Sequence, residues 1–92
     1  MATILIVDDR PSNRSYLSAL LGMSGHRILE AETGACALAI TRAELPDLIL
    51  VDWMLPGSSG ISLARKLRTD ERTRHIPIIM LTAKDSEQDK VD

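Results

Sequence analysis

Three short apolar runs, each followed at once by a carboxyl or hydroxyl side chain, place the strongest constraint on how this chain folds. The runs and the polar residues after them are residues 4–7 before Asp8 and Asp9, 48–51 before Asp52, and 78–81 before Thr82. Strands that are buried on both faces of a parallel sheet have this near-continuous Val, Ile and Leu composition. Ligands bind beyond the carboxyl ends of such strands. We therefore expect the four polar side chains to converge on one pocket.

Segments with helical periodicity separate the strands, which predicts an α/β fold with a parallel sheet. The expected order is strand 4–7, helix 11–24, strand 26–31, helix 34–43, strand 47–53, a turn at 54–60, helix 61–69, strand 76–81, and a further helix beginning near Ser86. Gly25 and Pro46 are expected to end the first two helices. In the first helix, the spacing places on one face the residues Leu17, Leu20, Leu21 and Ser24.

The chemistry of the expected pocket favours a bound cation. Buried carboxylates at Asp8, Asp9 and Asp52 would repel one another and take up protons if nothing compensated their charge. A divalent cation with a preference for oxygen ligands removes that difficulty, and Mg²⁺ is the natural candidate.

Length and charge exclude several function classes. A chain of 92 residues allows one domain with a small core, here residues 1–92. The net charge of −2 gives no long-range attraction to nucleic acid or to a membrane surface. The apolar runs are far shorter than a membrane span, and residues 1–3 lead into a strand without a signal sequence, so we expect a cytoplasmic protein.

One basic segment could suggest nucleic-acid binding. Its members are Arg65, Lys66, Arg68, Arg72 and Arg74. No aromatic residues are interleaved with them and two acidic residues interrupt the segment, so a solvated helix face is the favoured interpretation.

Taken together, these motifs resemble the receiver domain of bacterial two-component response regulators. The resemblance runs along the whole chain and rests on Asp8 and Asp9 after the first strand, Asp52 followed by residues 55–57 and Gly60, and Thr82 with Ala83. It implies a doubly wound, flavodoxin-like fold with three layers, α/β/α.

The resemblance also implies a role for each site residue. Asp52 would be the nucleophile that accepts a phosphoryl group from a histidine kinase or a phosphotransfer protein. Asp9, Asp8 and Asp52 would bind Mg²⁺ together with the backbone carbonyl of Met54, and Thr82 would donate its hydroxyl to a phosphoryl oxygen. Such a protein modifies only itself, with no turnover of external substrates, and it switches a partner surface on its fourth helix and the flanking strand.

The chain departs from the family pattern at its end. That pattern continues through a fifth strand, which carries a lysine and a switch aromatic, and a fifth helix, whereas this chain ends at Asp92. Lys84 follows Thr82 too closely to take the role of the family lysine. The strand at 76–81 would then be an exposed sheet edge, through which we expect self-association.

Two rival interpretations remain, of which the second is disfavoured. Residues 4–13 resemble receivers attached to sensor kinases, and the chain from Asp52 onward resembles those fused to winged-helix DNA-binding domains, so an engineered hybrid or a truncated fragment that folds without signalling is one alternative. The other is a haloacid-dehalogenase-like phosphatase, which also uses a strand-end aspartate and magnesium. It requires a second acid two positions after the nucleophile, where this chain has Arg10 or Met54.

Overall fold

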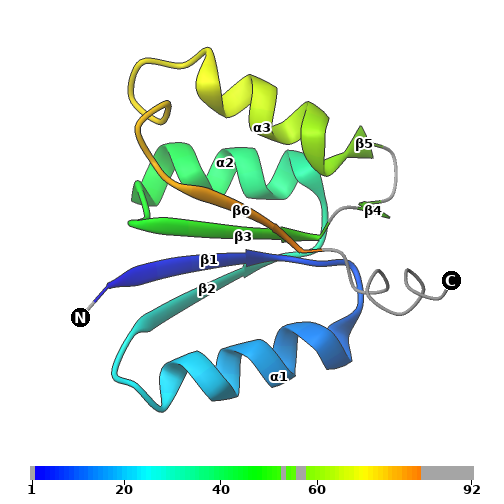
Figure 1. The fold of residues 1–92 in the computed structure, drawn as a ribbon, viewed down its shortest axis with the longest axis vertical. Helices are drawn as coiled ribbons and strands as arrows, with labels where there is room; N and C mark the ends of the chain where they lie inside the picture. Colours follow the sequence, from blue (N-terminus) through cyan, green and yellow to red (C-terminus); the bar gives the residue numbers. More distant parts are fainter. Residues whose placement is uncertain (1, 53, 56–57, 82–92) are drawn as a thin grey trace, which may run out of the picture.

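The computed structural model describes residues 2–52, 54–55 and 58–81. Apart from two additional short strands, these form helices and strands in the alternating order that the sequence predicted (Figure 1). The helix predicted to begin near Ser86 lies outside the described residues. The elements are β1 (Thr3–Val7), α1 (Pro11–Gly22), β2 (Arg27–Ala31), α2 (Gly34–Glu44), β3 (Leu48–Asp52), β4 (Met54–Leu55), β5 (Ser58–Ser59), α3 (Gly60–Arg68) and β6 (Ile78–Leu81).

Four parallel strands form the main sheet in the order β2-β1-β3-β6. The chain starts near the middle, moves outward to β2, and then crosses back over β1 to β3 and β6. This crossover puts α1 on one face of the sheet and α2 with α3 on the other (Figure 1). The predicted doubly wound, three-layer fold is thereby confirmed.

Two apolar cores fill the spaces between the layers. The core under α2 and α3 is the larger one and contains Leu5, Val7, Ala31, Ala37, Ile49, Val51, Leu63, Leu67 and Ile76. On the α1 side, the buried residues are Ile4, Ile6 and Leu50, with Leu17 and Leu21 of α1 packed against them. Neighbouring residues in β1 therefore point to opposite faces, and both faces are apolar, as the continuous run required.

The first helix is shorter and more exposed than predicted. It begins at Pro11 and ends at Gly22, before the expected residue 24, and the turn that follows contains Gly25 at a φ of +86°. Leu20, which the spacing placed on the same face as Leu17 and Leu21, is 49% exposed. None of the residues of α1 is fully buried.

The second helix has a defined start and end. The side chain of Thr33 accepts a 3.1 Å hydrogen bond from the backbone N–H of Cys36, which caps the first turn. Leu45 ends the helix at a φ of 47°, and Pro46 follows, as predicted, before β3.

The segment between β3 and α3 differs from prediction. Residues 54–60 were expected to form only a turn, but β4 and β5 pair there as a small antiparallel sheet. The third helix then begins at Gly60 and buries Leu63 and Leu67. Its exposed residues include Arg65, Lys66 and Arg68, and Nη1 of Arg68 donates hydrogen bonds to the main-chain carbonyls of Arg74 and Ile76.

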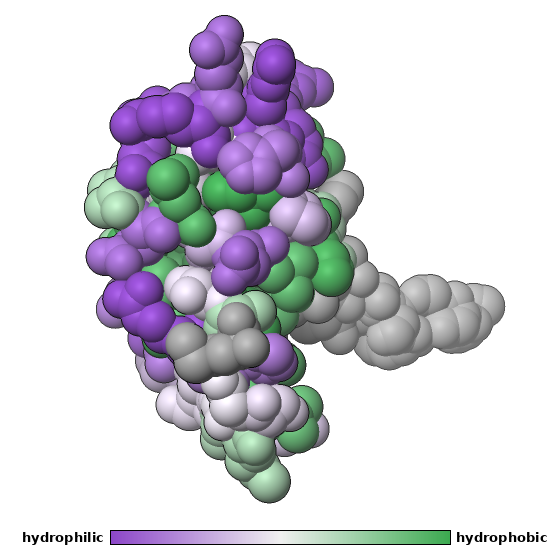
Figure 2. Space-filling model, turned by 90° about the vertical axis from the view of Figure 1, so that its left-hand side faces the viewer, coloured by the Kyte–Doolittle hydropathy of each residue, from purple (hydrophilic) through white to green (hydrophobic). Residues whose placement is uncertain are grey.

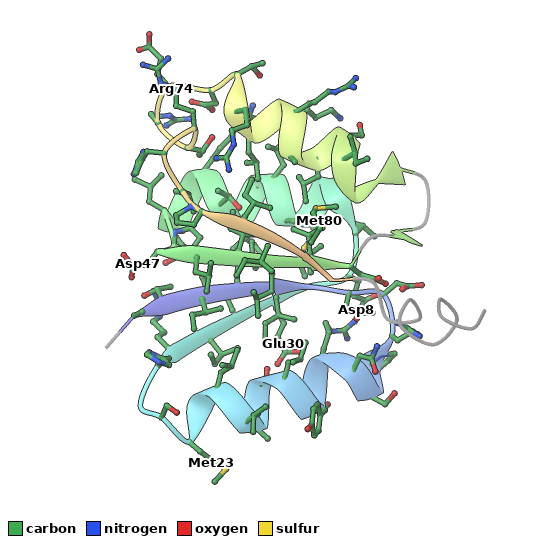
Figure 3. All side chains as sticks on the ribbon, in the orientation of Figure 1. Asp8, Met23, Glu30, Asp47, Arg74 and Met80 are labelled. Carbon is green, nitrogen blue, oxygen red and sulfur yellow. The ribbon has the colours of Figure 1, made fainter. Side chains whose placement is uncertain are left out.

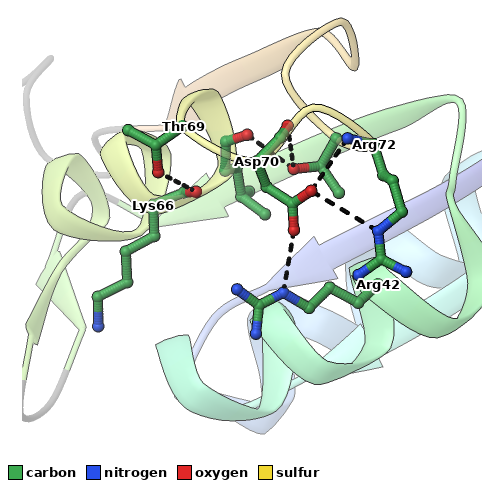
Figure 4. Close-up of polar contacts among 7 residues, drawn as sticks. Arg42, Lys66, Thr69, Asp70 and Arg72 are labelled. Atoms are coloured by element: carbon green, nitrogen blue, oxygen red, sulfur yellow. Dashed lines mark hydrogen bonds and ion pairs between the residues drawn. The ribbon is translucent and has the colours of Figure 1, made fainter.

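A carboxylate organises the connection from α3 to β6. Asp70 accepts hydrogen bonds from the backbone N–H of Arg72 at 3.0 Å and from Nε of Arg42 in α2 at 3.2 Å (Figure 4). In the same connection, the buried hydroxyl of Thr73 donates a 2.7 Å hydrogen bond to the carbonyl of Leu67. The backbone N–H of Arg72 is the largest of the effects that lower the pKa of Asp70 below its usual value, followed by the Arg42 side chain.

Hydrophilic residues dominate this end of the molecule. Figure 2 shows strongly hydrophilic side chains gathered at the top of the view, over α3 and the connection after it, with less hydrophilic ones toward α1 at the bottom. The loop carries the exposed residues Glu71, Arg72, Arg74 and His75. It ends at Ile76, which is buried, and β6 begins at Ile78, later than the predicted residue 76.

Candidate metal centre

Strand register brings Asp8 and Asp52 to the same edge of the sheet. Val7 of β1 pairs with Val51 of β3, so the residues that follow them leave neighbouring strands at the same level. Asp8 and Asp52 are both nearly buried, at 4% and 5% exposure, whereas Asp9 is exposed. One carboxylate oxygen from each of these three residues lies within 4.8 Å of the other two.

Local hydrogen bonds fix the orientation of the Asp8 carboxylate. Oδ1 accepts a 2.9 Å hydrogen bond from the backbone N–H of Arg10, which forms an Asx turn at the start of α1. Oδ2 accepts a 3.3 Å hydrogen bond from Nδ2 of Asn13. The positive end of the helix dipole of α1 also favours a negative charge here. These contacts tie the acidic loop to the helix that follows it.

Arg14 ties the same loop to β2. Its Nη1 donates a 2.7 Å hydrogen bond to the main-chain carbonyl of Asp8, and its Nε donates a 3.3 Å hydrogen bond to Oε1 of Glu30. Ser18 donates to the other oxygen of Glu30 at 2.7 Å. The Arg14 side chain is only 13% exposed, so it lies as a bridge between α1, β2 and the acidic loop.

A second arginine lies against the carboxylates themselves. Nε of Arg10 is 3.7 Å from Oδ1 of Asp8, and its Nη2 is 3.9 Å from Oδ2 of Asp52. The guanidinium therefore spans two of the three clustered residues. The Arg10 side chain remains 50% exposed, so it approaches the cluster from solvent.

Gly60 leaves room for the end of β3. A Cβ atom at Gly60 would lie 2.9 Å from the carbonyl oxygen of Asp52 and 2.5 Å from Cε of Met80. Only glycine permits this close approach of the first turn of α3 to the Asp52 backbone. Glycine is therefore required at position 60 because α3 packs closely against the backbone of the site residue Asp52.

The donor set fits Mg²⁺. Carboxylate oxygens are its preferred protein ligands, and oxygens bound directly to one ion at about 2.1 Å lie at most about 4.2 Å apart. The three carboxylate oxygens lie within 4.8 Å of one another, so a small side-chain movement or a bridging water would let all three bind one ion. Figure 3 shows Asp8 at the carboxyl end of the strands, on the side of the molecule opposite Asp47.

The structure brings together three of the predicted site residues, Asp8, Asp9 and Asp52. Met54 follows in β4, where its backbone is described, while Thr82 and Lys84 lie outside the described residues. Thr82 follows Leu81, which is in register with Asp52. The roles assigned to these residues stay predictions.

Sequence reasoning missed the basic and amide side chains that surround the carboxylates. The available signal was position, because Arg10 directly follows the Asp8-Asp9 pair and precedes α1, while Asn13 and Arg14 lie in the first turn of that helix. Residues in the first turn of such a helix necessarily lie beside the carboxyl end of the preceding strand.

Comparison with known proteins gives consistent matches. The profile of the family described as "Response regulator receiver domain" matches residues 4–92. The chain is 55% identical over 89 residues to the phosphate regulon transcriptional regulatory protein PhoB of Pseudomonas aeruginosa, which covers 97% of this chain and 39% of that protein. It is 46% identical over 91 residues to protein PilH of the same organism, covering 99% and 75%. The chain thus spans well under half of the PhoB relative and about three quarters of PilH.

Comparison with solved structures also identifies response regulator receiver domains as similar proteins. The N-terminal domain of a response regulator receiver protein from Methanoculleus marisnigri superposes with a TM-score of 0.88 at 38% identity, over 91% of this chain and 68% of that one. The chemotaxis response regulator CheY4 of Vibrio cholerae also gives a TM-score of 0.88, at 32% identity, over 98% and 75%. Within the described part of the chain, no helix is long and apolar enough to cross a membrane.

Proposed function

Because this chain belongs to the family of response regulator receiver domains of two-component systems, we propose that it accepts a phosphoryl group on Asp52. The donor is a phosphohistidine on a histidine kinase or a phosphotransfer protein. A carboxylate oxygen of Asp52 attacks phosphorus, the bond from phosphorus to the imidazole nitrogen breaks, and the electron pair returns to the imidazole. The product is an acyl phosphate on this chain, which modifies itself and turns over no external substrate.

The observation that carries this proposal is the placement of Asp52. Its carboxylate lies at the carboxyl end of β3, nearly buried, in register with the end of β1 and beside Asp8 and Asp9. A single carboxylate in such a position could be a structural cap. Three carboxylates with oxygens within 4.8 Å of one another repel each other, and a divalent cation that takes part in phosphoryl transfer would relieve this repulsion.

The other residues hold and orient the reacting groups. Asp8 and Asp9 would bind Mg²⁺ together with Asp52 and the Met54 carbonyl. When bound, the ion screens the negative phosphoryl oxygens from the carboxylates. Thr82 would donate its hydroxyl to a phosphoryl oxygen. Asp8 is already oriented for this task by the backbone N–H of Arg10.

Phosphorylation would change a surface that a partner recognises. We place that surface on the predicted fourth helix, which lies outside the described residues, and on its flanking strand, in a cytoplasmic protein. The PhoB relative is named a transcriptional regulator, so an attached output domain that binds DNA is compatible with the proposal, although direct nucleic-acid binding by this receiver is not part of it.

The exposed edge of the main sheet supports a second property. In the sheet formed by the described residues, β6 has a strand neighbour on one side only, and Ile79 in it is 48% exposed. Exposed, apolar edge strands pair readily with another chain. We therefore include self-association through β6 in the proposal, which is also the behaviour expected of a fragment that folds without signalling.

The decisive experiment follows the phosphoryl group. The full chain is incubated with Mg²⁺ and a small phosphodonor such as acetyl phosphate, and the product is analysed by mass spectrometry before and after hydroxylamine. We expect one added phosphoryl group that hydroxylamine removes, because acyl phosphates react with it and serine or threonine esters do not. The Asp52→Asn variant should show none.

Asp47→Asn is the matched control, since Asp47 lies at the opposite end of the sheet (Figure 3). It should be phosphorylated like wild type. Label that resists hydroxylamine, or that persists in Asp52→Asn, would refute the assignment of Asp52.

A further inference from the structure

We propose that Arg10 is a counter-cation built into the acidic cluster, which competes with Mg²⁺ for Asp8 and Asp52 and so weakens the affinity of the site for the ion. The inference rests on the proposed metal site. It assigns to Arg10 a role in setting the affinity for Mg²⁺, which the sequence analysis did not suggest.

The geometry places the guanidinium between the two buried acids. Its Nε lies 3.7 Å from Oδ1 of Asp8 and its Nη2 lies 3.9 Å from Oδ2 of Asp52. Both carboxylates are at least 90% buried, so water screens them poorly. The position of Arg10 is also fixed at its backbone, because its N–H donates to the same Asp8 carboxylate.

Arg10 and Mg²⁺ satisfy the same electrostatic need. Clustered carboxylates require positive charge nearby, and in the absence of an ion the guanidinium supplies one unit of it. A bound Mg²⁺ supplies two units and repels the guanidinium. Because the Arg10 side chain is 50% exposed, it can rotate into solvent when the ion enters.

Competition of this kind has a predictable size. The contacts of Arg10 are long ion pairs at a partly exposed position, and such pairs are individually weak. Removing both should tighten Mg²⁺ binding by about threefold to tenfold. The apo protein should become less stable at the same time, since Asp8 and Asp52 each lose an ion pair with Arg10.

These two effects separate competition from a structural role. If Arg10 only supported the fold, the Arg10→Gln variant would melt below wild type by the same amount with and without Mg²⁺. If Arg10 competes with the ion, the deficit in melting temperature should shrink as Mg²⁺ approaches saturation, because the bound ion replaces the lost charge.

The experiment is a Mg²⁺ titration of the full chain by calorimetry, with melts at zero and saturating Mg²⁺. The variants are Arg10→Gln, Arg10→Lys and Arg74→Gln. Arg74 carries the same charge at the far end of the molecule from Asp8 (Figure 3), so its variant controls for net charge. We expect tighter binding for Arg10→Gln only, with Arg10→Lys and Arg74→Gln within about twofold of wild type.

Several results would overturn the inference. It fails if Arg10→Gln binds Mg²⁺ no more tightly than wild type, or if Arg10→Lys or Arg74→Gln tightens binding as much. It also fails if the melting deficit of Arg10→Gln is equal at zero and saturating Mg²⁺.

Two further variants, Asp9→Asn and Asp52→Asn, separate this failure from failure of the proposed function. If wild type binds Mg²⁺ and both lose it, the metal site stands whatever Arg10 does. If neither wild type nor Arg10→Gln binds Mg²⁺, the metal site and the role of Arg10 are both refuted.

Discussion

Arg14 donates a 2.7 Å hydrogen bond from Nη1 to the main-chain carbonyl of Asp8 while its Nε donates to the Glu30 carboxylate. One side chain therefore connects the loop that carries the candidate metal ligands to β2. A planar guanidinium can make both contacts at once because its donors form a rigid fork, whereas a lysine ammonium is a compact point charge.

We expect Arg14→Lys to lower the free energy of unfolding by about 1–2 kcal/mol, because a charge-assisted hydrogen bond at a largely buried position is lost. Urea denaturation measures this. Arg27→Lys is the matched control, since Arg27 pairs with Glu44 where both side chains are well exposed. That change should cost less than about 0.5 kcal/mol. Equal effects of the two substitutions would contradict a bridging role for Arg14.

Substitution of Gly60 tests the packing beside Asp52. Gly60→Ala places a methyl group 2.9 Å from a backbone oxygen that cannot move freely, so we expect a loss of about 1–3 kcal/mol. Gly22→Ala is the control, because a Cβ there meets nothing within 4 Å and alanine favours the helix. Thermal melts of the two variants should therefore shift in different directions or by very different amounts. A Gly60→Ala variant as stable as Gly22→Ala would show that α3 can move away from β3 at no cost.

Asp70 should make stability depend on pH in the acid range. Its pKa is lower in the folded protein than its usual 3.8, chiefly because the Arg72 backbone N–H donates to the carboxylate. Between the lowered and the usual pKa, the folded state binds fewer protons than the unfolded state. The contribution is thus complete above about pH 4 and is lost as the pH falls through the lowered value.

Asp70→Asn should consequently be less stable than wild type at neutral pH, with a difference that narrows at acid pH. Urea denaturation at a series of pH values from about 7 to about 2.5 measures it. Glu71→Gln, at the exposed neighbouring position, provides the control. If the difference in the free energy of unfolding between Asp70→Asn and wild type were constant across this range, the charge of the Asp70 carboxylate would not contribute to stability.

Ile79 is the position at which self-association can be tested. We expect the full chain to form dimers or larger species in light scattering coupled to size exclusion, and Ile79→Lys to shift them toward monomer, since a charge on an edge strand discourages pairing. Leu20→Lys is matched to it, because Leu20 is equally exposed but lies on α1. A folded wild-type monomer at high concentration, or an equal effect of Leu20→Lys, would contradict association through β6.

The strands and their order along the chain were largely predictable from the sequence because burial on both faces leaves an unmistakable pattern. In a chain with helical segments between its apolar runs, residues 4–7 and 48–51 are readily identified as buried parallel strands. The ends of these strands locate Asp8 and Asp52. The helix face was less predictable. Spacing alone grouped Leu20 with Leu17 and Leu21, but only Leu17 and Leu21 pack against the core. Leu20 is rotated by about 100° around the helix axis from Leu21, which turns it away from the sheet.

The surroundings of the carboxylates were not predictable by the same reasoning. Arg10 and Arg14 have long side chains, and the contacts of such side chains depend on rotamers that no sequence spacing specifies. The small β4 and β5 sheet was missed for a related reason, because a segment rich in Pro, Gly and Ser indicates a turn without specifying how the backbone pairs on either side of it.

The unequal size of the two cores has a dynamic consequence. Elements with little buried apolar surface open most often, and α1, with no fully buried residue, is of that kind, whereas β1 and β3 are protected on both sides. Amide hydrogens of α1 should therefore exchange faster than those of the central strands. Because Asn13 and Arg14 hold the Asp8 loop from α1, each local opening of this helix also releases the acidic loop. The rigidity of the candidate site is thus set by its least protected helix and not by the strands that carry its carboxylates.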